Sequence, residues 1–181
     1  MNSDRYYVLG QLVTAVTILR ESRTAYAVLP EIRSNPVMAC KDAQTIEDVA
    51  GIPGRLTEVF GTITASAYPA WGGSKYTALI LLAVKKIKPT VRAAMEIKYN
   101  PMLVEIIEDL GISIAHMEIR QGASLDDILN TCICDGVLAD VLYTEGGFAR
   151  EGAIIVTGEN AVNVADTIIK IADIYAVRNK K

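Results

Sequence analysis

The order of helical and extended segments along the chain constrains its fold more than any other feature. Apolar residues recur at helical spacing in several stretches, and turns or short extended runs separate these stretches. We expect helices at about residues 4–20, 74–87, 100–110, 124–132 and 160–175. We expect strands at about residues 55–64, 91–99, 112–119, 140–144 and 153–157. This alternation predicts an α/β fold in which helices cover both faces of a sheet, a three-layer α/β/α arrangement.

Residues 91–99 carry the clearest strand pattern in the chain. One set of side chains faces one way: Val91, Ala93, Met95, Ile97 and Tyr99. The other set faces the opposite way: Arg92, Ala94, Glu96 and Lys98. Such alternation predicts a strand with one buried face. Because strands of a fully covered parallel sheet are continuous apolar runs, the pattern also indicates a mixed sheet.

Capping residues mark where helices begin. A residue that can cap a helix precedes four of the expected helices, at Asp4, Ser74, Asn100 and Ser124. Pro101, directly after Asn100, suits a first helical turn. Thr45 and Asp48 have the spacing of a variant capping box, which predicts a further short helix that Gly51 ends.

Composition and charge exclude several classes of function. The 181 residues carry a net charge of −3, and no Lys or Arg run exceeds two residues before Lys180–Lys181, so we expect no nucleic-acid partner. The longest uncharged apolar run, residues 76–84, is far shorter than the about 20 residues that span a bilayer, so we expect no membrane association. The N-terminal residues lack the layout of a secretory signal. The length predicts a single domain over residues 1–181.

The cysteines and the single histidine show no metal-binding or nucleophile pattern. Cys40, Cys132 and Cys134 are odd in number and match no zinc framework. We therefore expect free thiols, a cytoplasmic protein and no metal site. His116 lies within an expected strand with no ligand partner at suitable spacing, so a structural role is favoured over a catalytic one.

Three loops beside expected helices or strands could contact phosphate. The residues Trp71–Ser74 open a helix, where unpaired backbone N–H groups and partial positive charge favour anions. A lysine, Lys98, lies at the end of an expected strand, directly before the helix that begins at about Asn100–Pro101. Open α/β sheets bind ligands at such positions. Tyr143–Gly147 contains paired glycines after another strand. In each case an ordinary turn or helix cap is the alternative interpretation.

Two further candidates precede or follow prolines. Residues 30–36 lie between two prolines, so the loop is stiff and could present its polar residues in fixed geometry, or simply cover the core. Arg55 follows Pro53–Gly54 and precedes a strand. Its side chain binds a ligand only if an acid or a phosphate meets it, and the residues alone leave both possibilities open.

Six blocks of the sequence, in order, resemble the ThiN family of thiamine-phosphate synthases. They are Pro30–Asn35, Ile46–Ala50 followed by Gly54–Arg55, Trp71–Ser74, Arg92–Tyr99, Asp140–Tyr143 and Gly146–Gly147. Their spacing is also similar to that of the family. The resemblance covers about residues 28–175, preceded by the N-terminal helix at about 4–20.

The resemblance implies a fold related to class II aldolases and a homodimer. It also implies that the chain joins hydroxymethylpyrimidine diphosphate to hydroxyethylthiazole phosphate and releases pyrophosphate, with Mg²⁺ a plausible companion of the diphosphate. The implied catalytic residues are Arg55 and Tyr76. The implied substrate- and phosphate-binding residues are Glu31, Asn35, Gly72, Gly73, Ser74, Lys98, Tyr99, Asp140, Glu145, Gly146 and Gly147.

The chain departs from the family motif at three places. Tyr76 and Leu79 stand where the family pattern has a histidine and an arginine after the Gly-x-Ser loop. Thr144–Gly147 replaces a turn that carries another arginine in the family. Because tyrosine carries no positive charge at neutral pH, a second interpretation stays open: a non-catalytic domain that binds or senses thiamine phosphate.

Overall fold

The structure is a computed structural model that describes residues 2–119, 122–147 and 151–179. Its α-helices are α1 (Asn2–Glu21), α2 (Tyr76–Ile87), α3 (Pro101–Asp109), α4 (Leu125–Asn130) and α5 (Ala161–Arg178). The strands of its main sheet are β1 (Val37–Ala39), β2 (Val49–Gly51), β5 (Ala70–Trp71), β6 (Ala93–Lys98), β7 (Ile114–His116), β10 (Val141–Thr144) and β11 (Ala153–Gly158). Two hairpins stand apart: β3 (Leu56–Val59) with β4 (Thr62–Ala65), and β8 (Ile133–Cys134) with β9 (Val137–Leu138). Two 3₁₀ turns, Ala25–Val28 and Ile46–Asp48, complete the elements.

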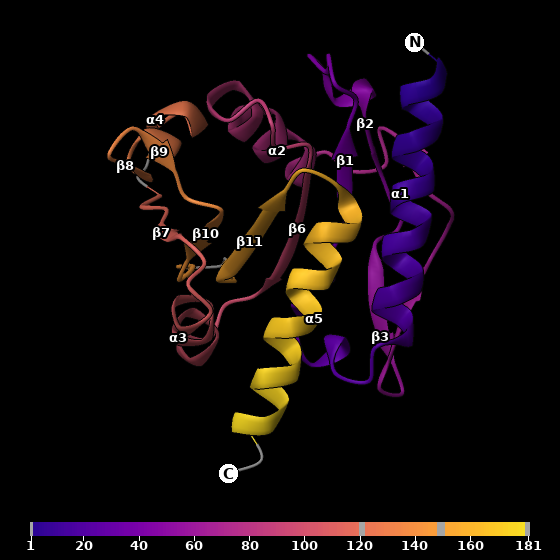
Figure 1. Ribbon diagram of the computed structural model, residues 1–181, viewed down its shortest axis with the longest axis vertical. Helices are drawn as coiled ribbons and strands as arrows, with labels where there is room; N and C mark the ends of the chain where they lie inside the picture. The colour runs from indigo at the N-terminus through magenta and orange to yellow at the C-terminus, as the bar shows by residue number, and fades with distance from the viewer. Residues whose placement is uncertain (1, 120–121, 148–150, 180–181) are drawn as a thin grey trace.

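The main sheet is mixed, as the alternation in residues 91–99 predicts. Its strand order is β5-β2-β1-β6-β11-β10-β7. Figure 1 labels all of these strands except β5. Strands β7 and β10 are parallel, and every other neighbouring pair in this sheet is antiparallel. Within the described residues the chain is therefore an α/β protein with a seven-stranded mixed sheet and five α-helices, which confirms the predicted class.

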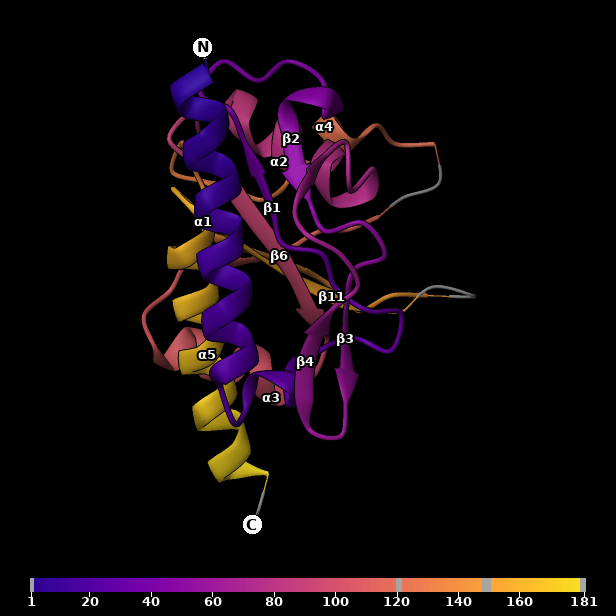
Figure 2. The same ribbon diagram turned by 90° about the vertical axis from the view of Figure 1, so that its right-hand side faces the viewer.

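Helices lie on both faces of the sheet. Helices α1 and α5 pack on one face and α2 and α4 on the other, as Figure 2 shows from the side. Strand β6 lies between the two resulting cores: Met95 and Ile97 join the α5 side, and Ala94 joins the α2 side. The prediction of a strand with one exposed face was wrong, because the short side chain of Ala94 and the carboxyl-bearing Glu96 are also buried.

The first helix is present, but its buried stripe is rotated from the one that helical spacing predicts, which is Leu9, Leu12, Val13, Val16 and Leu19. Val8, Leu12, Ala15 and Leu19 are fully buried, whereas Val13 is 44% exposed. Apolar residues lie on neighbouring faces of this helix, so the sequence pattern alone does not determine which face is buried. Packing against α5 and β4 determines it.

Asp4 is not the cap of α1, because the helix already begins at Asn2. Its carboxylate accepts a hydrogen bond from the backbone N–H of Lys41 at 2.8 Å and one from Arg92 Nη2 at 2.8 Å. These two contacts tie the first turn of α1 to the loop after β1 and to the residue before β6.

Several cap predictions are confirmed. The side chains of Asn100 and Ser124 each accept a backbone N–H of the helix that follows. Asn160, which was not predicted as a cap, does the same for α5. Thr45 and Asp48 form the predicted capping box, although the turn that they close is a short 3₁₀ helix. Gly51 does not end that helix but lies in strand β2, because the chain becomes extended directly at Val49.

Two strand predictions were too long. Residues 55–64 form a hairpin rather than one strand, since Phe60 and Gly61 reverse the chain with φ of 51° and 76°. Both angles are those of a tight hairpin turn. The sequence did not predict this turn, because phenylalanine is not a residue typical of it. Strand β7 covers only residues 114–116 of the predicted 112–119. Among the described residues, no helix has the length and apolar character needed to cross a membrane.

Candidate active site

A cleft of about 940 Å³ opens at the edge of the sheet where β10 ends and β11 begins. Its lining comes from separate parts of the chain: Ile32, Arg33, Asn35, Gly54, Arg55, the run Gly73–Thr77, Glu96, Thr144, Glu151 and Ala153. Strand β6 and the turns before β1, β3 and α2 thus meet at one place. Five residues that the sequence singled out line this cleft, namely Asn35, Arg55, Gly73, Ser74 and Tyr76.

The cleft has a cationic rim and a buried polar floor. Arg33, Arg55 and Lys75 are exposed, which keeps their charged groups in contact with water. The polar residues of the floor are almost fully buried: Asn35 at 3% exposure, Thr77 at 2%, Glu96 at 7% and Thr144 at 6%. An anionic group therefore meets positive charge at the rim, and only an uncharged or cationic group suits the floor beside Glu96.

The loop before α2 requires glycine where it enters the cleft. A Cβ at Gly73 would lie 2.6 Å from the carbonyl oxygen of Gly51 and 2.9 Å from that of Ala70, so no side chain fits. Gly72 has φ of +67° and donates its N–H to the Val49 carbonyl at 2.9 Å, but it is not among the residues that line the cleft. The paired glycines therefore let this turn pack tightly against β2.

Asn35 holds that turn in place. Its Nδ2 donates to the carbonyl oxygens of Ile52 (2.9 Å) and Gly73 (3.2 Å), and its Oδ1 accepts the N–H of Ile52 at 2.7 Å. Both amide hydrogens are thus used within the protein. Asn35 lines the cleft, but it acts first as a clamp between the loop before α2 and the segment after β2.

Arg55 lies at the rim in an unusual backbone conformation. Its φ is 68°, in the left-handed region that non-glycine residues seldom adopt. Its Nη1 donates to the Ile32 carbonyl at 2.8 Å, which joins two rim segments and leaves other guanidinium N–H groups for a ligand. The strained backbone and this hydrogen bond together fix the direction of the guanidinium.

Glu96 is the functional candidate that the sequence reasoning missed. It lies in β6 opposite Ile155 of β11, and the hydroxyl of the buried Ser34 donates to its backbone carbonyl at 2.5 Å. Among the residues that the structure describes, its Oε1 is buried and has no hydrogen-bond partner. Burial raises the pKa of Glu96, and the charge of Arg55 opposes that rise. A carboxyl residue in the middle of an otherwise apolar strand was the available signal.

Tyr76 begins α2 at the cleft, where the family pattern has a histidine. It is 55% exposed, and Leu79, three residues on and 54% exposed, stands at the position of the family's arginine. Ser74 lines the cleft but does not cap α2, since the N-cap position is Lys75 and no side chain accepts from the first turn. The prediction of a Ser74 cap was wrong. The start of α2 therefore lies at the cleft with Lys75 as its N-cap residue.

Lys98 and Tyr99 lie outside the lining of the cleft. The Lys98 ammonium lies 4.9 Å from the ring centroid of Tyr175 in α5. The Tyr99 ring stacks on Tyr143 at 5.9 Å, and its hydroxyl donates to Glu145 Oε1 at 3.2 Å. Partial burial and then the neighbouring Glu145 carboxylate raise the pKa of Tyr99. These residues form a separate aromatic and ionic group beside the sheet edge.

The two remaining predicted loops flank the cleft. The backbone N–H of Gly146 donates to Thr144 Oγ1 at 3.3 Å, and Gly147 follows it with open space around its Cα. The backbone N–H of Glu31 donates to Glu151 Oε1 at 3.2 Å. The Thr144 and Glu151 side chains line the cleft, whereas Glu31, Gly146 and Gly147 are not part of the lining.

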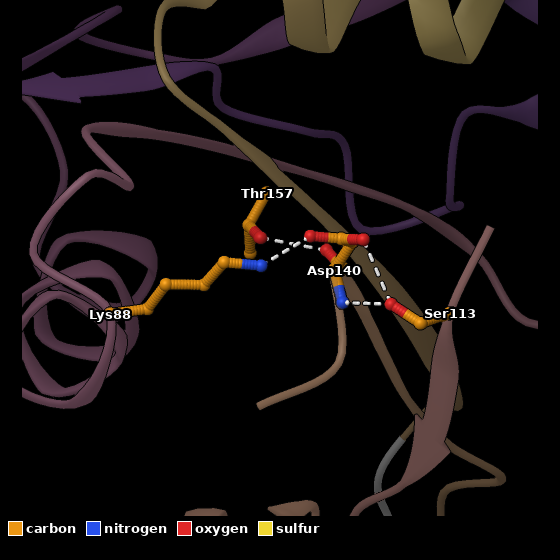
Figure 3. Close-up of polar contacts among 4 residues, drawn as sticks. All are labelled: Lys88, Ser113, Asp140 and Thr157. Atoms are coloured by element: carbon orange, nitrogen blue, oxygen red, sulfur yellow. Dashed lines mark hydrogen bonds and ion pairs between the residues drawn. The ribbon is translucent and has the colours of Figure 1, made fainter. Parts of the chain in front are cut away.

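Asp140 lies at the opposite end of β10 from Thr144 and therefore away from the cleft. Figure 3 shows its carboxylate between Lys88 Nζ at 2.5 Å and Ser113 Oγ at 2.8 Å, while its backbone carbonyl accepts the Thr157 hydroxyl at 2.7 Å. Burial acts to raise the pKa of Asp140, but the hydrogen bonds from Lys88 and Ser113 and the lysine charge together lower it. The contacts join α2 to three strands of the sheet, which is a structural role.

The described residues contain no group of three His, Cys, Asp or Glu side chains that could hold a metal ion. Of the two carboxylates at the cleft, Glu151 already accepts backbone N–H groups from residues 31 and 32 at 3.2 and 3.4 Å. A Mg²⁺ ion would therefore depend on phosphate oxygens and water for most of its ligands, as Mg²⁺ commonly does with diphosphates. The side chains fit an ion that arrives with its substrate, and they do not fit a cage built from protein alone.

The fold and the cleft define an α/β protein of mixed sheet with a polar, cation-rimmed ligand cleft at one sheet edge. A model of the thiamine-phosphate synthase ThiN family matches residues 11–170. A thiamine-phosphate synthase ThiN from Methanothermobacter thermautotrophicus is 34% identical over 158 residues, covering 82% of this chain and 83% of that protein. The chain belongs to the ThiN thiamine-phosphate synthase family, a family of transferases in thiamine biosynthesis. The resemblance inferred from the loops is thereby confirmed.

Other relatives agree with this assignment. The bifunctional thiamine biosynthesis protein ThiDN from Methanocaldococcus jannaschii is 27% identical over 173 residues, which cover 93% of this chain and 41% of that longer protein. The crystal structure of the C-terminal domain of protein MJ0236 superposes with a TM-score of 0.84 at 26% identity, covering 94% of this chain and 96% of that one. The C-terminal domain of a phosphomethylpyrimidine kinase gives a TM-score of 0.82 at 23% identity, covers 92% and 99% of the two chains, and supports the fold alone.

Proposed function

We propose that the chain joins hydroxymethylpyrimidine diphosphate to hydroxyethylthiazole phosphate and releases pyrophosphate, and that the reaction takes place in the cleft. The observation that carries the proposal is the cationic rim. Arg33, Arg55, Lys75 and the start of α2 surround one cavity. Two phosphorylated substrates need several sites for anions, and helix starts and guanidinium groups supply them.

The proposed chemistry needs positioning and charge stabilisation rather than a protein nucleophile. The bond between the pyrimidine methylene and the diphosphate oxygen breaks, and its electron pair leaves with pyrophosphate. The lone pair of the thiazole nitrogen forms the new carbon–nitrogen bond. Negative charge therefore grows on the leaving group, where Arg55 can stabilise it with paired N–H donors. Tyr76 can donate a hydrogen bond to the same oxygens.

Of the residues implied by the family resemblance, we assign phosphate contacts to Arg55, Gly73, Ser74 and Tyr76, all of which line the cleft. We assign Asn35 to holding the loop. Lys98, Tyr99 and Asp140 make contacts elsewhere, so we propose that they support the fold around the cleft.

The test is formation of thiamine phosphate from the two half-substrates, with pyrophosphate release measured at the same time. A reaction mixture without the thiazole phosphate measures simple hydrolysis. Arg55→Ala should lower kcat/KM by about 100-fold or more, since a charge-assisted contact to the leaving group is lost. Arg23→Ala is a matched control, because this arginine does not line the cleft. An Arg55→Ala enzyme as active as the Arg23→Ala enzyme would contradict the assignment.

The replacement of the family's histidine and arginine by Tyr76 and Leu79 in α2 favours a second candidate function, a domain that binds thiamine phosphate without making it. Tyr76 and Leu79 both remove positive charge relative to the family pattern. Calorimetric titration with thiamine phosphate, together with the turnover assay, separates the two candidates. Tight binding without turnover would favour the binding domain, and turnover gained in Tyr76→His would show that the family's histidine chemistry had been lost.

We propose three further properties that go with membership of this family. The three-layer arrangement would be related to that of class II aldolases, and residues 1–181 would form one domain. Free thiols at Cys40, Cys132 and Cys134 suit a cytoplasmic location.

We also propose a homodimer in which α1 takes part. Tyr6 and Tyr7 are 72% and 46% exposed on this helix. A second hollow of about 470 Å³ lies between α1 and the segment after β4, bordered by Val13 and the 86% exposed Tyr68. Light scattering on the purified chain should give twice the 19.6 kDa monomer mass, and Tyr68→Glu should shift it to the monomer.

A further inference from the structure

Glu96 stands apart from every other polar group on the floor of the cleft. The amide of Asn35 is used in hydrogen bonds to the backbone, and Thr144 Oγ1 accepts the N–H of Gly146. Glu96 Oε1, by contrast, is buried and has no partner in the part of the chain that the structure describes. An unpaired buried carboxyl oxygen carries a desolvation cost, and a ligand that donates a hydrogen bond to it relieves that cost.

The position of Glu96 is rigidly held. Its strand pairs with β1 on one side and β11 on the other, and the hydroxyl of buried Ser34 donates to its backbone carbonyl. The backbone that carries the carboxyl group is therefore fixed at the floor of the cleft. Its 7% exposure contrasts with the 55% exposure of Tyr76 at the α2 start. Any ligand group that reaches Glu96 must enter past the cationic rim.

The charge pattern decides which part of a substrate lies where. A phosphate group is attracted by the three exposed cations Arg33, Arg55 and Lys75. The Glu151 carboxylate, which also lines the cleft, accepts backbone N–H groups of residues 31 and 32, whereas Glu96 Oε1 has no partner among the described residues, so phosphates are placed at the rim and not beside Glu96. A thiazole ring has no N–H donor, and its nitrogen lone pair is the nucleophile. An aminopyrimidine ring presents an exocyclic amino group beside a ring nitrogen, which is one donor next to one acceptor. A single carboxyl group matches that edge with two hydrogen bonds.

We infer that Glu96 is a specificity-determining residue that binds the amino and ring-nitrogen edge of the aminopyrimidine substrate at the floor of the cleft. This inference rests on the proposed function for the identity of the substrate. One oxygen accepts from the amino group, and the other shares a single proton with the ring nitrogen. Burial raises the pKa of Glu96, and the nearby Arg55 charge acts in the opposite direction. A raised pKa makes it easier for the carboxyl group to share that proton with the ring nitrogen.

Two substitutions distinguish this role from a general effect on the site. Glu96→Gln keeps the size and offers a carbonyl acceptor beside an N–H donor, an arrangement that pairs with an aminopurine edge in other complexes. Glu96→Met keeps the length but removes both hydrogen bonds. We expect KM for the pyrimidine diphosphate to rise about 10- to 100-fold in Glu96→Met and by less than about 5-fold in Glu96→Gln, with KM for the thiazole phosphate unchanged in both. A rise in both KM values together, or in neither, would overturn the inference.

Binding to the wild-type protein gives a test that needs neither turnover nor a folded variant. Calorimetry compares the unphosphorylated hydroxymethyl-aminopyrimidine with its analogue that lacks the amino group. We expect the analogue to bind at least about 10-fold more weakly. Equal affinity, or no binding of the aminopyrimidine, would refute the role of Glu96. If the aminopyrimidine binds selectively and no thiamine phosphate forms, the proposed synthase reaction fails. The same pair of ligands titrated into Glu96→Met then tests Glu96 separately, and selectivity that persists in Glu96→Met would overturn the inference.

Discussion

Replacing Asn35 with alanine should destabilise the protein far more than an ordinary surface substitution. The side chain makes three hydrogen bonds to backbone groups, two to Ile52 and one to Gly73, and it is 3% exposed. Each such bond contributes about 1 kcal/mol net, so Asn35→Ala should lower the free energy of unfolding by about 3 kcal/mol. For a chain of this length that corresponds to a fall in Tm of roughly 6–12 °C.

Urea unfolding followed by circular dichroism measures this loss, and Asn100→Ala is the matched control. Asn100 caps α3 through one hydrogen bond to the N–H of Met102 at 2.9 Å, so its replacement should cost about 1 kcal/mol. A loss for Asn35→Ala no larger than that of the control would refute the view that Asn35 is a structural clamp. Reduced phosphate affinity at unchanged stability would instead make it a direct ligand contact.

Four further substitutions test other parts of the structure. Gly73→Ala should lower the free energy of unfolding, measured in urea, by about 1–3 kcal/mol because the added Cβ would overlap backbone oxygens. Gly10→Ala should raise it by about 0.5–1 kcal/mol, because Gly10 lies in α1 with open space where a Cβ would be. A Gly73→Ala protein as stable as the wild type would contradict the close contact between Gly73 and the Gly51 and Ala70 carbonyl oxygens. Phe60→Asn should raise Tm by about 1–3 °C, since Phe60 is fully exposed at φ of 51° and asparagine favours that conformation; a fall in Tm would argue against the turn. Asp140→Asn should lower Tm at pH 7. The pKa of Asp140 is lower in the folded protein than its ordinary value of 3.8. The Tm difference between the wild-type protein and Asp140→Asn should therefore be largest above pH 3.8 and should disappear as the pH falls through the lower folded pKa. A Tm difference that stays constant at acid pH would contradict the contribution of the carboxylate charge.

The caps at Asn100 and Ser124 were predictable because they depend on neighbours in the sequence, whereas the caps predicted at Asp4 and Ser74 were wrong. Asn100 and Ser124 accept N–H groups two and three residues ahead, so local residue types suffice to place them. The hairpin at Phe60–Gly61 was not predictable on the same grounds. A phenylalanine gives no turn signal, and pairing between β3 and β4 imposes its backbone conformation.

The candidate site was predictable in part. The glycine turn before α2 and the flanking Arg55 and Asn35 were recognised as motifs, and the structure brings them to one cleft. Lys98 lies outside the lining of the cleft, since its position at the end of β6 does not determine where a long flexible side chain goes. Its ammonium lies over Tyr175, a residue 77 positions later in the chain.

By itself, the sequence determined the α/β class, the mixed sheet, most helix starts and the family, because these depend on short-range patterns and on the order of motifs. Only the tertiary structure decided that Glu96 is buried beneath exposed cations and that its Oε1 has no hydrogen-bond partner among the described residues. Alternation along β6 gives the face on which a side chain lies, but burial of that face depends on α2 and on the turns around it. A charge pattern built from residues 33, 55, 75 and 96 exists only once these distant segments pack together, since no local interaction links them.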